Sequence, residues 1–181
     1  MVLAQQGDGQ AFESLTLAHY TRLYRVAKSI LRDRHAAEDA TQQALLDIWR
    51  YIRRLRDPSR FNGWSYRLLV RACYAEAKRV SKDGEVGPLS EDIVSTADEY
   101  RTVADRDQLE RAFSRMSLDH RTVIVLRHLL DMTPDEVADV LGISRGTVYA
   151  RLRRAESAMR AALQADARPP ASLAPQQEVA R

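Results

Sequence analysis

The stretch from Met132 to Leu163, MTPDEVADVLGISRGTVYARLRRAESAMRAAL, holds two predicted helices separated by a three-residue turn. Thr133, Pro134 and Glu136 fit the N-cap, first and third helical positions of a capping box, with proline preset for the opening turn. Gly142 can adopt the left-handed backbone that ends a helix and turns the chain. This is the spacing of a helix-turn-helix, which makes duplex DNA the leading candidate partner.

The second helix of this motif, which Ser144 can cap, has one apolar and one basic face. Val148, Leu152, Ala155 and Met159 cluster on the side that packs. The first turns of such a helix enter the major groove, where arginine can bridge guanine O6 and N7 or neutralise a phosphate. The residues expected at the DNA are Ser144, Arg145, Thr147, Tyr149, Ala150, Arg151, Arg153 and Arg154. The alternative, a solvated arginine-rich helix in an ordinary bundle, is less favoured because the three parts of the motif occur in order.

The charge of the chain varies along its length. The 181 residues have a formal net charge of only +3. Residues 48–80 carry nine Lys or Arg against two acids, whereas residues 81–105 carry seven acids against two basic residues. A chain of this length can hold two small domains, and the acidic stretch, with its glycines and little periodicity, predicts a flexible linker between them.

Cysteine content and hydropathy bear on the compartment. The single cysteine, Cys73, excludes an internal disulfide and suits a reducing cytoplasm. There is no apolar run of about 18 residues and no signal-peptide pattern at the start, so we expect a cytoplasmic protein without membrane insertion.

The periodicity predicts an all-α fold of two small helical domains joined by the flexible linker. The expected helices are 8–31, 35–56, 59–80, 107–116, 119–130, 133–141 and 145–163. The expected organisation is a first domain at 1–80, the linker at 81–105, the helix-turn-helix domain at 106–165 and a disordered tail at 166–181.

The predicted helix 35–56 has two contrasting faces. Its buried seam is Thr41, Leu45, Ile48, Ile52 and Leu55. The opposite side comprises Asp39, Gln42, Gln43, Leu46, Arg50 and Arg53. An apolar leucine ringed by polar groups fits a protein docking site, and a solvated surface is the equally open alternative.

The next predicted helix interleaves aromatic and basic residues. These are Phe61, Trp64, Tyr66 and Tyr74 with Arg60, Arg67, Arg71, Lys78 and Arg79. Such a pattern suits single-stranded nucleic acid, where bases stack on rings and phosphates meet cations. A core role is the alternative for Phe61, and it is the favoured one for Trp64.

Taken together, the two halves resemble the extracytoplasmic-function group of bacterial sigma factors over nearly the whole chain. GDGQAFESLTLAHYTRLYRVAKSIL (7–31) and AAEDATQQALLDIWR (36–50) resemble regions 2.1 and 2.2 of that family. SRFNGWSYRLLVRA (59–72) resembles regions 2.3 and 2.4, and MSLDHRTVIVLRHLLDMTPDEVADVLGISRGTVYARLRRA (116–155) resembles region 4.

The resemblance implies core RNA polymerase as a partner, through the β′ clamp helices and the β flap, together with promoter DNA and an inhibitory anti-sigma factor. The implied polymerase-binding residues are Glu38, Asp39, Gln42, Leu46 and Arg50. Those implied to capture the melted minus-10 strand are Arg60, Phe61, Asn62, Trp64, Arg67 and Arg71. The helix-turn-helix would read the minus-35 duplex, and the acidic linker would thread through polymerase.

Five positions depart from the family pattern. Arg71 stands where asparagine is common, Ser65 where leucine is usual and Gln43 where an acid is common. Asp131 replaces a usual glycine before the helix-turn-helix, and Tyr149 replaces a frequent lysine. The last change removes an expected phosphate contact and is expected to alter promoter preference.

Two other classes of protein are less favoured. A conventional helix-turn-helix regulator, acting on duplex DNA without core polymerase, would need a receiver or ligand-binding domain that the first hundred residues do not suggest. An enzyme is disfavoured because the four histidines are scattered, with no HExxH, CxxC or phosphate loop. We expect no metal, no cofactor and no intrinsic catalysis, the chemistry belonging to polymerase.

Overall fold

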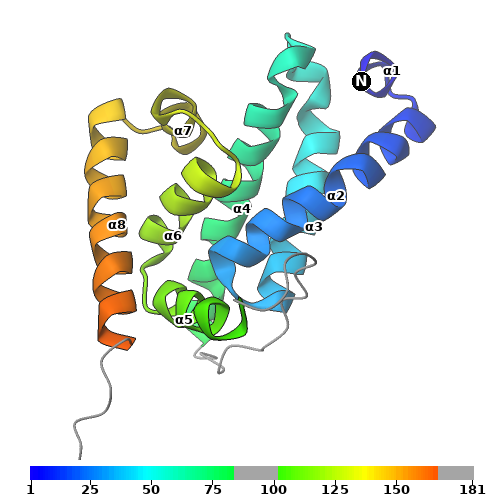
Figure 1. Ribbon diagram of the computed structural model, residues 1–181. Coiled ribbons are helices and arrows are strands. Elements are labelled where there is room, and N and C mark those ends of the chain that lie inside the picture. Colours follow the sequence, from blue (N-terminus) through cyan, green and yellow to red (C-terminus); the bar gives the residue numbers. More distant parts are fainter. Residues whose placement is uncertain (84–101, 167–181) are drawn as a thin grey trace, which may run out of the picture.

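A computed structural model describes residues 1–83 and 102–166, which form helices and no strands (Figure 1). The predicted all-α fold is therefore confirmed. The first half comprises α1 (Val2–Gln6), α2 (Gly9–Leu31), α3 (Arg34–Tyr51) and α4 (Phe61–Asp83), with short 3-10 turns at Ile52–Arg54 and Pro58–Arg60. The second half comprises α5 (Thr102–Ser114), α6 (Leu118–Ile124), α7 (Pro134–Leu141) and α8 (Arg145–Asp166).

The helix-turn-helix forms at the residues that its local chemistry predicts. Thr133 N–H donates to Glu136 Oε2 over 2.7 Å, and Glu136 N–H donates to Thr133 Oγ1 over 3.3 Å, completing the capping box. Gly142 ends α7 in the left-handed region at φ 66°. Ser144 Oγ accepts from Thr147 N–H over 3.1 Å at the start of α8. The turn and the entry angle of α8 are thus fixed by local interactions.

The predicted helix 35–56 is wrong at its end, because α3 stops at Tyr51 and continues as a 3-10 turn. Leu55 and Asp57 are extended, as expected close to Pro58. The short helix α1, which the sequence analysis missed, supplies a hydrogen-bond donor to backbone carbonyls that follow the end of α3. The Gln5 carboxamide donates to the carbonyls of Ile52 over 3.1 Å and Leu55 over 2.6 Å.

The predicted helix 119–130 is also interrupted. The α-helical turns end at Ile124, and Val125–Leu129 form a π-helix in which Leu130 N–H donates to the Val125 carbonyl over 3.2 Å. Asp131 follows in the left-handed region at φ 51°. This backbone explains why glycine is usual there, since glycine adopts positive φ without steric cost.

The two halves pack against one another and share a continuous apolar core. In the first half α3 lies against α2 and α4, and in the second half α6 lies against α8. Helix α4 also packs on α7, and α2 packs on α6, so α4 lies between the rest of the first half and the helix-turn-helix (Figure 1). The parts predicted as separate domains are therefore in direct contact.

The boundaries of the predicted linker differ slightly from the structure. Helix α4 runs to Asp83 and α5 begins at Thr102, so both ends of the predicted 81–105 segment are helical. The remainder of that segment, and the predicted disordered tail beyond Asp166, lie outside the described residues. No helix within the described ranges is long and apolar enough to cross a membrane.

Candidate nucleic-acid interface

The exposed side of α3 gathers the residues implied to bind polymerase, and we call Glu38, Asp39, Gln42, Leu46 and Arg50 the α3 face. Its opposite side carries buried Ala37, Ala40, Thr41, Ala44 and Ile48. Leu46 at the centre of the face is 51% exposed. The helical register therefore presents an apolar side chain among polar neighbours, as the sequence predicted.

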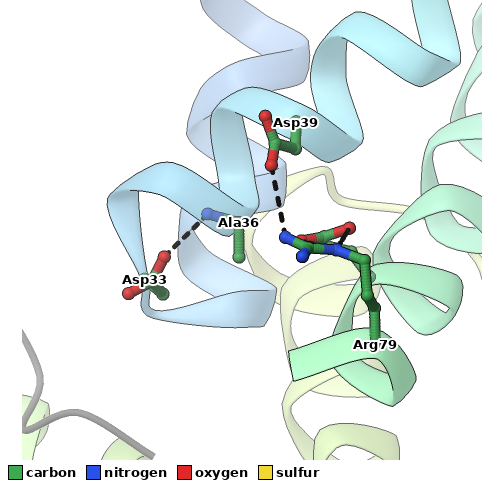
Figure 2. Close-up of polar contacts among 5 residues, drawn as sticks. Asp33, Ala36, Asp39 and Arg79 are labelled. Carbon is green, nitrogen blue, oxygen red and sulfur yellow. Dashed lines mark hydrogen bonds and ion pairs between the residues drawn. The ribbon is translucent and has the colours of Figure 1, made fainter. Parts of the chain in front are cut away.

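The charged residues of the α3 face form exposed ion pairs. Glu38 Oε1 lies 3.0 Å from Arg34 Nε on the same helix. Asp39 Oδ2 lies 3.5 Å from Nη2 of Arg79, which reaches across from α4 (Figure 2). Such pairs contribute about 0–1 kcal/mol each, so a partner can replace them at little cost.

Trp49 extends the α3 face, although the sequence analysis did not single it out. Its side chain is 44% exposed, and its ring lies edge-on to Phe12 of α2 with centroids 4.6 Å apart. Trp49 follows Leu46 by three residues, and residues three apart on a helix are neighbours. That spacing was the available signal, and it indicates an apolar strip broader than one leucine.

The start of α4 is held by a local cap. Asp57 accepts hydrogen bonds from Ser59 N–H over 2.9 Å and from Ser59 Oγ over 2.7 Å. These bonds to Ser59 lower the pKa of Asp57 from its ordinary value. Arg60 pairs with Asp57 at 3.5 Å while its side chain remains 81% exposed, and Asn62 is also exposed. The loop at residues 57–62 thus presents the Arg60 guanidinium and the Asn62 amide to solvent on a fixed backbone.

The aromatic residues beside this loop are mostly packed. Phe61 is only 5% exposed and lies between His19 and Trp64, with ring centroids 5.0 and 6.0 Å away. Trp64 is half-buried against the core. Burial, followed by the charge of Arg22, lowers the pKa of His19. Phe61 is therefore a core residue, which is one of the two roles that the sequence left open, and its ring supports the loop.

Arg67 and Arg71 lie one and two turns further along α4 from Trp64. Arg71 is exposed, whereas Arg67 is half-buried and its Nε has no hydrogen-bond partner among the described residues. Both line a cleft of about 650 Å³ between α4 and the helix-turn-helix. Arg151 of α8 lines the same cleft. The structure therefore brings together arginines that the sequence assigned to two different DNA elements.

The exposed side of α8 carries most of the predicted duplex-binding residues. Buried Val148, Leu152 and Ala155 hold the opposite side on the core. Ser144, Arg145, Thr147, Tyr149, Arg153 and Arg154 are exposed, while Ala150 and Arg151 are half-buried. This arrangement matches the two faces expected from the sequence.

Arg145 in the first turn of α8 is oriented by two neighbours. Its Nη2 donates to Tyr149 Oη over 3.3 Å, and its guanidinium carbon lies 5.6 Å from the centroid of that ring. Its Nε lies 3.3 Å from Asp135 Oδ1 of α7. The hydrogen bond to Tyr149 and the charge of Asp135 raise the pKa of Arg145. Tyr149, which stands at a position where lysine is frequent in the family, thus helps to hold the Arg145 guanidinium.

Comparisons with known proteins agree over both halves. The family model described as Sigma-70 region 2 matches residues 15–82, and that described as Sigma-70, region 4 matches residues 106–159. The chain is 30% identical over 151 residues to the ECF RNA polymerase sigma factor SigM of Mycobacterium tuberculosis, covering 83% of this chain and 76% of SigM. It is 29% identical over 165 residues to SigL of the same organism, covering 89% and 93% of the two chains.

Solved structures show the same arrangement of helices. CnrH, solved in complex with the cytosolic domain of CnrY, gives a TM-score of 0.65 at 25% identity, over 91% of this chain and 95% of that one. RpoE of Bartonella quintana, solved with the anti-sigma factor NepR, gives 0.68 at 23% identity, over 87% and 99%. The chain belongs to the sigma-70 family of RNA polymerase sigma factors, in its extracytoplasmic-function (ECF) group.

Proposed function

We propose that this sigma factor binds core RNA polymerase through the α3 face, docking on the β′ clamp helices. The observation that carries the proposal is the exposed apolar pair Leu46 and Trp49, which shares the exposed side of α3 with Glu38, Asp39 and Arg50. An apolar centre with a polar rim is the usual anatomy of a protein interface. The weak exposed ion pairs of this face leave its charges available to a partner.

For the melted minus-10 strand, the proposed binding surface is the start of α4. Arg60 and Asn62 are exposed there on a backbone held by the Asp57 cap. Phe61 supports the loop from the core, half-buried Trp64 flanks it, and Arg67 and Arg71 continue the cationic path along α4. Exposed cations and polar edges suit a single strand whose phosphates need neutralising and whose bases are unpaired.

For the minus-35 duplex, the proposed reader is α8, and region 4 is proposed to contact the β flap. Arg145, Thr147 and Tyr149 lie in its first two turns, which enter the major groove in a helix-turn-helix complex. Arg153 and Arg154 lie further along the helix, where we assign them to phosphates. Each half alone would contact DNA through a small interface. Holding both halves on polymerase raises their effective concentration at the promoter.

An anti-sigma factor is the proposed inhibitory partner. RpoE, whose fold this chain shares, was solved with one. The exposed apolar residues of the α3 face offer such a protein a surface that it would share with polymerase, so that binding of the two would be mutually exclusive.

Run-off transcription tests this function directly. Purified bacterial core polymerase is supplied with a pool of promoter fragments from the source genome, with and without this protein. Discrete start sites that depend on the protein are the expected result. Duplex binding with no binding to core polymerase would overturn the proposal and favour the conventional regulator.

A further inference from the structure

Three exposed side chains meet where α7 packs beside the first turns of α8. Arg145 Nε lies 3.3 Å from Asp135 Oδ1, and Arg145 Nη2 donates to Tyr149 Oη over 3.3 Å. The guanidinium also lies over the Tyr149 ring, with its carbon 5.6 Å from the ring centroid. Arg145 and Tyr149 are four residues apart and share one face of α8, whereas Asp135 belongs to α7. One arginine is thus held from two helices, at the end of α8 that enters the major groove in a helix-turn-helix complex.

These contacts contribute little to the stability of the fold. The side chains of Arg145 and Asp135 are 61% and 64% exposed, and ion pairs at such exposure are weakened by solvent. Tyr149 is exposed as well. The starts of both helices are already fixed by the Thr133 capping box and the Ser144 cap. The three side chains are therefore available to serve a bound partner.

The two contacts determine which part of DNA suits Arg145. A guanidinium has five N–H donors in one plane, and Asp135 and Tyr149 lie along the edge that carries Nε–H and one N–H of Nη2. The end of the fork, with one N–H on each Nη, can then meet the O6 and N7 acceptors of guanine. A phosphate is less suitable, because the Asp135 carboxylate offsets the positive charge that would attract it. A guanine edge is neutral and requires a pair of donors with a fixed direction.

We propose that Asp135 and Tyr149 are positioning residues that hold the Arg145 fork for one guanine of the minus-35 element. They act through Arg145 and determine base preference more than overall affinity. Asp135, which the sequence analysis did not assign to DNA, thereby joins the duplex-binding site. This inference rests on the proposed function, because it takes α8 as the reader of the duplex, and it adds the identity of the base.

Selection of bound duplexes from a library with a randomised segment tests the proposal. The full chain is used without polymerase, at high protein concentration. The parent chain should enrich guanine at one position of the bound sequence. Tyr149→Phe keeps the ring and removes the hydroxyl, and Asp135→Asn removes the carboxylate charge. Each variant should reduce the guanine preference by about two- to tenfold, because the fork is no longer held in one direction.

A second readout separates positioning from a purely structural role of Asp135. Asp135→Asn should bind a duplex without the guanine more tightly than the parent chain does, because a carboxylate that repels phosphates has been removed. Specificity would then fall while non-specific affinity rises. If Asp135 only stabilised the first turn of α7, its replacement would weaken binding to all duplexes together.

The matched control is Asp139→Asn, which removes the same charge from an exposed position of α7 four residues further along. It should leave the guanine preference unchanged, and circular dichroism should show all variants folded. An unchanged preference in Asp135→Asn or in Tyr149→Phe would overturn the role of that residue, and a parent chain that selects no guanine would overturn the whole proposal. A parent chain that selects guanine but never binds core polymerase would overturn the proposed function instead, and the positioning of Arg145 would stand.

Discussion

Arg121 of α6 donates from Nε to the carbonyl oxygen of Ile30 over 2.8 Å, joining the second half to the last turn of α2. That carbonyl belongs to a helix end, where backbone acceptors lack helical partners and a positive charge is favourable. Arg121 also donates to the Met116 carbonyl over 3.2 Å. Burial, followed by the charge of Arg32, lowers the pKa of Arg121. One side chain therefore satisfies acceptors in both halves.

Replacing this arginine should destabilise the protein. Arg121→Ala leaves two carbonyls without that donor, and we expect the free energy of unfolding to fall by about 2 kcal/mol. Urea denaturation followed by circular dichroism measures the change. Arg25→Ala, which removes an exposed cation of α2, is the control and should change stability by less than about 0.5 kcal/mol. Equal stability of the two variants would contradict the assignment.

Reversing the charge of Asp39 should abolish binding to core polymerase without unfolding the chain. Asp39→Lys places a cation in the α3 face, and like charges across an interface cost several kcal/mol. Binding to immobilised core polymerase is the measurement. Arg79→Ala removes the partner of Asp39 in the free protein and should leave binding nearly intact. If Asp39→Lys binds normally, the α3 face is not the polymerase interface.

Two arginines of α8 should differ in how they affect DNA binding. Arg154→Ala should weaken binding to all duplexes and reduce the slope of log affinity against log salt by about one, because it removes a phosphate contact. Arg145→Ala should change the preferred base at one position of the minus-35 element. Selection from a randomised promoter library, with salt titrations for both variants, measures these effects. Identical base preferences in the two variants would exclude base reading by Arg145.

The capping box at α7 should make the helix-turn-helix sensitive to acid. Hydrogen bonds from the Thr133 backbone and side chain lower the pKa of Glu136. A lowered folded-state pKa adds stability above the ordinary glutamate pKa, and this stability is lost as pH falls through the folded value. Thr133→Ala should cost about 1 kcal/mol at neutral pH. Glu136→Gln should flatten the acid side of the stability profile, and an unchanged profile would contradict this account.

Tyr74 should have the opposite dependence, at alkaline pH. Burial first, and then the hydrogen bond to Asp119, raise the pKa of Tyr74 to about 12. Its contribution to stability is complete below the ordinary tyrosine pKa of about 10 and is lost as pH rises through the folded value. Urea titrations at about pH 9 and about pH 11 should therefore show a smaller alkaline loss in Tyr74→Phe than in the parent chain. Equal losses would show that Tyr74 keeps an ordinary pKa.

The parts of the fold that sequence predicted well are governed by local interactions. Thr133, Gly142 and Ser144 each act within four residues, so their caps and turns can be inferred from spacing alone. The exposed side of α3 follows in the same way from helical periodicity. The helix α1 was missed because five residues, VLAQQ, carry no side-chain cap and too short a pattern.

The parts that sequence did not predict depend on distant contacts. The π-helix after Ile124 interrupts a pattern that is typical of a continuous helix. Tyr74 and Asp119 are 45 residues apart, and no spacing rule indicates that a tyrosine of one half meets a carboxylate of the other. The burial of Phe61 was left open for the same reason, because the rings that cover it come partly from α2.

The carboxamide of Gln5 has a mechanical consequence. Its two bonds, to the carbonyls of Ile52 and Leu55, lie between the end of α3 and the loop that starts α4. The segment that connects the surface proposed for polymerase with the surface proposed for single-stranded DNA is thus anchored to the first helix of the chain. Because one side chain holds both carbonyls, we expect a shift of α1 to move the end of α3 and the Leu55 segment together.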